Sequence, residues 1–331
     1  MAKATVEAPS NIAFVKYWGV EDIDRAIPQA PSLSMTLRRC ATRTTVAFTP
    51  DADTADTVRV AAPDGTLRPA SDAFARPVVQ HLDRLRTWAG ASGAFDVATQ
   101  NSFPAAAGLG SSASGFAALT LATLKALNTW PDTATRSALT RRSGSGSAAR
   151  SVFGGYVTWP HGDDHAAECI APHTHWDLRD VVAVVETEPK PVSSRDGHQR
   201  APSSPFYEQR LAHLPDRMRT ARDGVANRDF SQLGPLIETE GVELHLITMS
   251  SQPPIFYWSP ATLAVLEVVR AMRRDGLAAY ATMDAGANVH VICPPGDEPA
   301  IAARLDALDA VHMVIRDGVG PGPTTEVDPL F

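Results

Sequence analysis

The sequence contains little that would indicate a secreted protein, a membrane-spanning protein or a protein stabilised by a structural metal ion. Its 331 residues include three cysteines, Cys40, Cys169 and Cys293, which are widely separated and show no CxxC spacing. A disulfide framework and a structural zinc site are therefore not expected. No apolar run approaches the roughly 18 residues of a membrane span, and the start, MAKATVEAPSNIAF, lacks an apolar segment of signal-peptide length. We therefore expect a cytoplasmic protein with no membrane partner.

Basic residues are too few for a nucleic-acid partner. The formal net charge is −7, from 30 lysine and arginine residues against 37 aspartate and glutamate residues. Affinity for a polyanion comes largely from a basic surface. Any site for an anion must therefore be local, built from a few side chains and backbone N–H groups.

A loop rich in glycine and serine runs directly into a helical pattern. It covers Ala105–Ser114 within NSFPAAAGLGSSASGFAALTL and matches neither Walker A nor the glycine spacing of dinucleotide-binding loops. The free N–H groups at the start of a helix attract phosphate, and hydroxyls there can contact phosphate oxygens or magnesium. The loop therefore predicts a phosphate site, with a tight packing turn as the alternative.

A second unusual stretch combines arginines with a flexible loop. Arg141, Arg142 and Arg150 flank the segment SGSGS at 143–147. Guanidinium groups beside exposed hydroxyls suit a phosphate or a carboxylate. A flexible linker is the alternative, although the apolar strand pattern at 154–159 follows at once. We therefore interpret this stretch as a ligand-binding loop.

The expected elements divide into a strand-rich part and a helix-rich part. Strand patterns occur at 11–17, 33–37, 42–48, 57–61, 94–100, 154–159, 180–187, 278–281, 290–293 and 311–315. Helix patterns occur at 74–89, after the glycine loop, and at 202–214, 215–228, 230–250 and 260–276, whereas KPVSSRDGH at 190–198 is interpreted as a loop. This pattern predicts an α+β fold with two domains, 1–186 and 187–331, and a cleft between them.

Six stretches resemble, in the same order, the mevalonate diphosphate decarboxylase family of the GHMP kinase superfamily. They are NIAFVKYWG, FPAAAGLGSSASGFAAL, RRSGSGSAARSVFGGYVTW, KPVSSRDGH, SQPPIFYWSP and TMDAGANVHV. The resemblance covers most of the chain. It implies an N-terminal domain like ribosomal protein S5 domain 2, a ferredoxin-like GHMP kinase C-terminal domain, and a homodimer. It also implies a reaction of the mevalonate pathway of isoprenoid biosynthesis: ATP phosphorylates the C3 hydroxyl of a 5-phosphorylated mevalonate, and phosphate and CO₂ then leave.

The resemblance also implies roles for individual residues. Asp284 would orient the tertiary hydroxyl and accept its proton, and Lys16 would neutralise charge on the transferred phosphoryl group. Arg150 would hold the C1 carboxylate, with Asn11 helping to orient it. The expected contacts to the 5-phosphoryl end are Tyr17, Ser145, Gly146, Ser147, Ser194 and Arg195. The expected contacts to ATP are Gly108, Gly110, Ser111, Ser112 and Ser114, with Mg²⁺ held at Ser111 and Ser112 through the phosphates.

Local sequence leaves simpler interpretations open for two of these residues. A strand-end lysine such as Lys16 is often a solvated charge, and a turn aspartate such as Asp284 often stabilises the turn itself.

One departure from the family pattern concerns the substrate. Members that act on the diphosphate usually read KYWGK-R-D, whereas Val20, Glu21 and Asp22 follow Gly19 here. Loss of a cation beside a polyphosphate weakens binding by roughly 1–3 kcal/mol, which favours mevalonate 5-phosphate as the substrate. Mevalonate 5-diphosphate is the alternative, because Arg25 could supply the missing charge. A kinase that stops at the 3-phosphate and a non-enzymatic sensor are further hypotheses.

Overall fold

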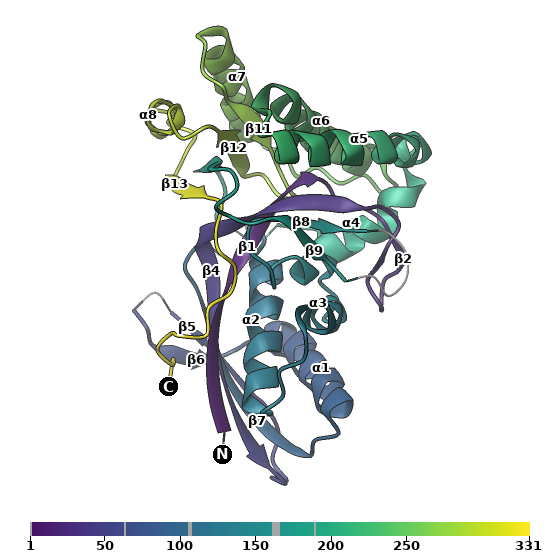
Figure 1. Cartoon of the computed structure of the whole chain (residues 1–331), viewed down its shortest axis with the longest axis vertical. Coiled ribbons are helices and arrows are strands. Elements are labelled where there is room, and N and C mark those ends of the chain that lie inside the picture. Colours follow the sequence, from purple (N-terminus) through teal and green to yellow (C-terminus); the bar gives the residue numbers. More distant parts are fainter. Residues whose placement is uncertain (1, 63, 105–107, 161–165, 189) are drawn as a thin grey trace.

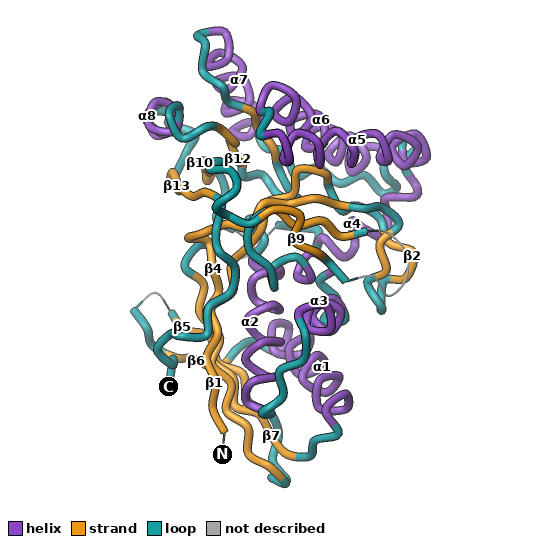
Figure 2. The backbone as a smooth tube through the Cα atoms, in the orientation of Figure 1, coloured by secondary structure: helices purple, strands orange, loops and turns teal. Residues whose placement is uncertain are grey.

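The computed structural model describes residues 2–62, 64–104, 108–160, 166–188 and 190–331. Residues 105–107 of the predicted phosphate loop lie outside the described residues. Two main sheets and a small two-stranded ribbon form the strand framework. Figure 2 shows the strands running through the middle of the molecule, with helices gathered beside each sheet. Among the described residues, no helix combines the length and apolar character needed to cross a membrane.

The first part of the chain builds the larger sheet, in the order β6-β5-β7-β4-β8-β9, with β1 paired to β4. Helices α1, α2 and α3 lie together beside this sheet (Figure 1). The elements are β1 (Ala2–Val15), β2 (Val20–Asp22), β3 (Ile27–Pro28), β4 (Ser32–Pro50), β5 (Thr57–Ala61), β6 (Leu67–Pro69), α1 (Asp72–Ala89), β7 (Gly93–Asn101), α2 (Ser111–Ala126), α3 (Thr133–Arg141), the 3-10 helix Gly146–Ala149, β8 (Tyr156–Trp159) and β9 (Glu168–Ala171).

The second part builds a smaller antiparallel sheet, in the order β11-β12-β10-β13. Its elements are β10 (Arg179–Val184), α4 (Ser194–Arg200), the 3-10 helix Ala201–Ser203, α5 (Tyr207–Asn227), α6 (Phe230–Ser250), α7 (Pro260–Arg274), β11 (Tyr280–Thr282), β12 (Val289–Cys293), α8 (Glu298–Asp306) and β13 (Met313–Gly318). The mixed helix and strand architecture agrees with the predicted α+β class. The chain changes sheet between β9 and β10, ahead of the expected boundary at residue 186.

Strand β4 replaces two predicted strands. The patterns at 33–37 and 42–48 are its two ends, and between them Arg38 and Arg39 are exposed. The backbone N–H groups of Arg38 and Cys40 donate to the carboxylate of Asp317 in β13, both at 2.8 Å. A carboxylate from the second sheet thus satisfies N–H groups where the apolar pattern is interrupted, and the local sequence does not reveal this partner.

The helices also depart from the predicted pattern. The segment KPVSSRDGH, interpreted as a loop, contains α4, whose N-cap Ser193 accepts a hydrogen bond from the Asp196 N–H. The helices predicted on either side of Pro215 form the single helix α5, in which Leu214 and Met218 are buried in the core. This packing outweighs the hydrogen bond that a proline removes. The short elements α3, β9 and α8 have no predicted counterpart.

A shared core joins the two parts of the chain. Ile12 and Leu33 of the first sheet belong to the same buried cluster as Leu214 and Ile237 of helices α5 and α6. After β13, the chain returns along the first sheet, where Glu7 and Thr324 exchange two backbone hydrogen bonds of 2.9 Å. Both termini therefore lie at the same end of the molecule (Figure 1).

Candidate active site

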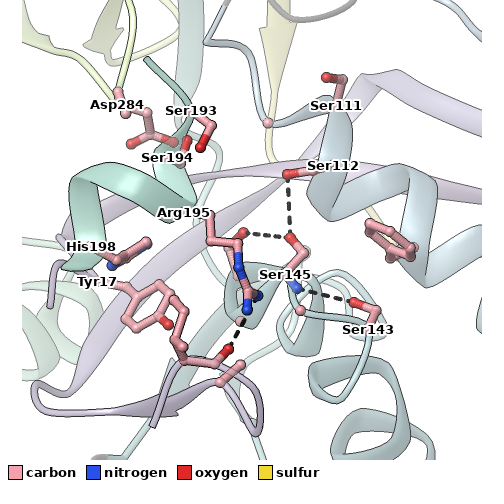
Figure 3. A pocket seen from close by; sticks show the side chains of 18 of the residues that line it. Tyr17, Ser111, Ser112, Ser143, Ser145, Ser193, Ser194, Arg195, His198 and Asp284 are labelled. Atoms are coloured by element: carbon pink, nitrogen blue, oxygen red, sulfur yellow. Dashed lines mark hydrogen bonds between the residues drawn. The ribbon is translucent and has the colours of Figure 1, made fainter. Parts of the chain in front are cut away.

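A cavity of about 980 Å³ lies where α1, α2, α4, the 143–147 loop and the β11–β12 turn meet. Most of the predicted site residues line it. They are Lys16, Tyr17, Gly108, Gly110, Ser111, Ser112, Ser145, Gly146, Ser147, Arg150, Ser194, Arg195 and Asp284. Figure 3 shows Asp284 and Ser194 on one side of this cavity, with Ser111 and Ser112 on the other.

Lys16 and Asp284 form an ion pair at the cavity, with Lys16 Nζ 2.8 Å from Asp284 Oδ1. The Lys16 side chain is 1% exposed, so it is not a solvated strand-end charge, whereas the Asp284 side chain is 30% exposed. Burial alone would raise the pKa of Asp284. The positive charge of Lys16, the hydrogen bond that Lys16 donates and the charge of Arg150 together outweigh burial and hold this pKa below its ordinary value. Asp284 is therefore an ionised carboxylate that faces the cavity.

Arg150 is fixed at all three of its guanidinium nitrogens. Nε donates to Ser34 Oγ at 2.9 Å, Nη1 to Ser32 Oγ at 2.6 Å, and Nη2 to Asn11 Oδ1 at 3.0 Å. Burial lowers the pKa of Arg150 to about 10, so the group stays charged near neutral pH. Asn11 lies behind Arg150 and is not among the residues that line the cavity. Asn11 instead contacts Arg150, the residue that was predicted to bind the C1 carboxylate of the substrate.

The N-terminus of α2 opens onto the cavity. The helix begins after Gly110, which has a φ of 72°, and Gly108 has a φ of 80°. A Cβ atom on Gly108 would lie 2.8 Å from the Cα atom of Gly286, so only glycine lets this loop approach the turn that carries Asp284. The N-terminal end of α2 therefore lies close to the turn that carries Asp284.

Ser114 does not belong to this surface. Its hydroxyl is fully buried and lies 2.7 Å from Thr42 Oγ1, in the packing of α2 against β4. Ser114 is also absent from the residues that line the cavity, and its place against the sheet does not support the prediction of Ser114 as an ATP contact. Ser112, by contrast, is exposed and reaches Ser145 across the cavity, with 3.3 Å between the two hydroxyl oxygens.

The expected 5-phosphoryl end contains a charge pair that the sequence did not reveal. Arg195 donates to Asp24 Oδ1 at 2.7 Å and to the Ile23 carbonyl at 3.2 Å, and all three residues line the cavity. The positive charge of Arg195 is thus already partnered. Val20 packs against the cluster that includes Tyr17, and it does not line the cavity.

Lys190 is a basic residue that lines the cavity, and it was not predicted from the sequence as a site residue. Its Nζ donates to Ser194 Oγ at 2.6 Å and to the Ala285 carbonyl at 2.7 Å. Burial lowers the pKa of Lys190 to about 8, although the charge of Asp284 opposes this shift. The group therefore loses its charge within reach of physiological pH.

Helix α1 contributes a further polar wall. Arg76, Gln80 and Arg84 line the cavity at intervals of four residues, together with Phe116 of α2. This spacing places all three on one helix face. The sequence therefore contained a pattern from which this polar wall of the cavity could have been predicted.

Comparison with known proteins identifies the family. The model of the diphosphomevalonate decarboxylase-like N-terminal domain matches residues 8–171, and that of the mevalonate 5-diphosphate decarboxylase C-terminal domain matches residues 180–324. A diphosphomevalonate decarboxylase of Candida albicans is 30% identical, over 98% of this chain and 98% of its own. The chain belongs to the diphosphomevalonate decarboxylase family. The predicted resemblance is confirmed.

Proteins similar to this chain are named after two different substrates, mevalonate phosphate and mevalonate diphosphate. A phosphomevalonate decarboxylase of Haloferax volcanii is 32% identical over 87% of each chain. Among solved structures, mevalonate diphosphate decarboxylase of Enterococcus faecalis is 34% identical, with a TM-score of 0.87 over 97% of this chain and 98% of that chain. A second structure, described as MDDEF in complex with MVAPP, AMPPCP and magnesium, is 34% identical, with a TM-score of 0.88 over 98% of each chain. These likenesses confirm the predicted fold.

Proposed function

We propose that this chain catalyses the ATP-dependent decarboxylation of mevalonate 5-diphosphate in isoprenoid biosynthesis. The observation that carries the proposal is the meeting of the Lys16–Asp284 pair, Arg150 and the N-terminus of α2 in one cavity. Membership of the family supports the reaction. The names of the Candida albicans and Enterococcus faecalis proteins support the diphosphate as substrate.

Each group has a chemical task in this reaction. Asp284 orients the C3 hydroxyl and accepts its proton as the oxygen attacks the γ-phosphorus of ATP, while Lys16 offsets the charge on the transferred group. Arg150 pairs with the C1 carboxylate, since each Nη atom retains a second N–H beyond its bond to the protein. The C3–O bond then breaks with its electron pair leaving on phosphate. The electrons of the C1–C2 bond form the alkene as CO₂ departs.

The cavity suits a magnesium nucleotide held mainly through its phosphates. Ser111 and Ser112 present hydroxyls at the N-terminus of α2, and Lys190 supplies a cation on the α4 side. Among the residues that the structure describes, no group of three His, Cys, Asp or Glu side chains could hold a metal ion. Mg²⁺ would therefore be bound by phosphate oxygens, with Ser111 and Ser112 as its protein contacts.

Mevalonate 5-phosphate is the second candidate substrate. The absence of a lysine after Gly19 favours it, and so does the similarity to the Haloferax volcanii phosphomevalonate decarboxylase. However, Val20 does not line the cavity. The names of the relatives support the 5-diphosphate better, so it replaces the 5-phosphate as the main candidate substrate.

Parallel steady-state kinetics on both compounds test the proposal. We expect a higher kcat/KM for the 5-diphosphate, with ADP and CO₂ formed in equal amounts. A higher kcat/KM for the 5-phosphate would reverse the substrate assignment. Release of ADP without CO₂ would instead indicate a kinase that stops at the 3-phosphate, and no turnover of either compound would favour a non-enzymatic role.

Two further properties stay predictions. A homodimer is what membership of the family suggests, and light scattering coupled to gel filtration measures it. The cytoplasmic setting rests on the scarcity of cysteine, and cell fractionation tests it.

A further inference from the structure

Helix α6 contacts the backbone of both members of the Lys16–Asp284 pair. Glu240 Oε2 accepts a hydrogen bond from the Lys16 N–H at 2.9 Å, and His245 Nε2 lies 3.1 Å from the Asp284 carbonyl oxygen. Glu240 and His245 are both fully buried, and neither lines the cavity. They are five residues apart on one helix, which is about 7.5 Å along its axis. A single rigid element therefore spans the two backbone anchors of the pair.

Buried charges complete the attachment at Lys16. Arg210 Nη2 donates both to the Lys16 carbonyl at 3.0 Å and to Glu240 Oε2 at 2.9 Å. Arg217 Nη1 donates to Glu240 Oε1 at 2.6 Å. Both backbone groups of Lys16 are thus bound by side chains of α5 and α6. A buried carboxylate with two guanidinium partners is held in one geometry, because any displacement leaves a charge unpaired.

The contact at Asp284 fixes the state of His245. A carbonyl oxygen only accepts hydrogen bonds, so Nε2 carries the ring proton and donates. Burial, with repulsion from Lys16 as the next cause, lowers the pKa of His245 to about 3, so the ring is neutral. The neighbouring Gly241 brings α6 against the strand that leads to Asp284. A Cβ atom on Gly241 would lie 2.8 Å from Thr282 Oγ1 and 3.2 Å from the Met283 nitrogen.

We infer that Glu240 and His245 are positioning residues that set the separation of Lys16 and Asp284. The inference rests on the proposed function, in which this pair performs the proton transfer and the charge neutralisation. Neither residue touches the reacting atoms. Glu240 acts through the backbone of Lys16, and His245 acts through the backbone of Asp284.

Two substitutions test this role by removing one anchor each. Glu240→Gln weakens the attachment of Lys16, with Glu243 left as a partner for Arg210 and Arg217. His245→Phe removes the donor to Asp284 at similar volume. We expect kcat to fall by about 10–100-fold in each variant, as for a displacement near 1 Å, with both KM values within about twofold of wild type. His245→Gln, which retains an N–H donor, should recover most of the loss.

The pH profile separates positioning from simple destabilisation. Lys16, His290 and Arg150 all lower the pKa of Asp284, so displacement of Lys16 moves the acid limb of kcat to higher pH in Glu240→Gln. The control is Ile237→Val, another buried position of α6, which should lower thermal stability without changing kcat per folded enzyme or the acid limb. A fall in kcat with the wild-type pH profile, or with an equal effect of Ile237→Val, would overturn the inference.

Crystal structures of the variants give a readout that does not depend on activity. We expect the distance between Lys16 Nζ and Asp284 Oδ1 to depart from 2.8 Å in Glu240→Gln and in His245→Phe. An unchanged pair in both variants rejects the positioning role even if the wild type is active. Lack of wild-type turnover, with the pair displaced in the variants, rejects the proposed function and retains the positioning role.

Discussion

Lys16 Nζ lies 2.8 Å from Asp284 Oδ1, although 268 residues separate the two along the chain. Lys16 follows the long strand β1, and Asp284 follows the short strand β11 of the other sheet. The ion pair at the centre of the site thus joins residues that follow strands of two different sheets. Packing between the two parts of the chain consequently sets the geometry of the proposed chemistry.

The carboxylate of Asp284 should be essential for turnover. Asp284→Asn removes the proton acceptor and leaves Lys16 with a neutral partner, so we expect kcat to fall by about 10²–10⁴-fold. The coupled release of ADP and CO₂ measures this loss. Binding of a fluorescent ATP analogue serves as the control and should change little. ATP turnover equal to that of the wild type would remove Asp284 from the mechanism.

Lys190 should give an alkaline limb to the pH profile. Its pKa of about 8 means that the ammonium is present below this pH and is lost as the pH rises through it. The kcat/KM for ATP, which reports the free enzyme, should therefore fall above about pH 8. Lys190→Arg keeps the charge and should move the limb to higher pH. An identical limb in that variant would assign it to another group.

Arg150→Lys should impair the use of the carboxylate-bearing substrate. A lysine cannot make the paired contact of a guanidinium, and it leaves Ser32 or Ser34 without its present partner. We expect kcat/KM for the phosphorylated mevalonate to fall by about 10²-fold, from the loss of one charge-assisted bond and its geometry. The KM for ATP should stay within about twofold of wild type. A larger change for ATP than for mevalonate would contradict the assignment.

Asp24 should weaken substrate binding by occupying Arg195. The pair is exposed, with side-chain exposures of 44% for Arg195 and 84% for Asp24, so its energy is about 0–1 kcal/mol. Asp24→Asn should therefore lower the KM for the 5-diphosphate by about two- to fivefold. The matched control is Glu21→Gln. Glu21 is an exposed acidic residue of the neighbouring strand β2, and it does not line the cavity. Equal effects of both variants would indicate a general charge effect.

Ser114→Ala should affect stability and leave ATP binding unchanged. The substitution removes the buried hydrogen bond to Thr42, which costs about 0.5–1.5 kcal/mol of unfolding free energy. Urea denaturation measures this cost, and KM for ATP should remain within about twofold of wild type. A rise in KM beyond fivefold would restore Ser114 as a nucleotide contact.

The sequence predicted those features that local pattern encodes. The apolar period of α6 and the glycine-rich start of α2 were recognisable because each lies within a short stretch, and the ordered motifs indicated which residues would share a cavity. Pairings across long separations were not predictable. Asp317 satisfies the backbone of β4, Glu240 satisfies the backbone of Lys16, and Lys190 lies beside Ala285. Each depends on how two distant elements pack, for which one sequence holds no local signal.

The attachment of Lys16 limits how the cavity can open. Arg210 and Glu240 bind its backbone from the second part of the chain, and β1, which precedes it, pairs with β4 of the first. A hinge motion between the two parts would have to break buried hydrogen bonds and separate a common core. We therefore expect Lys16 and the elements that bind its backbone to move together. We expect substrate to enter and product to leave at the edge of the cavity where the exposed contact between Arg195 and Asp24 joins α4 to the loop between β2 and β3.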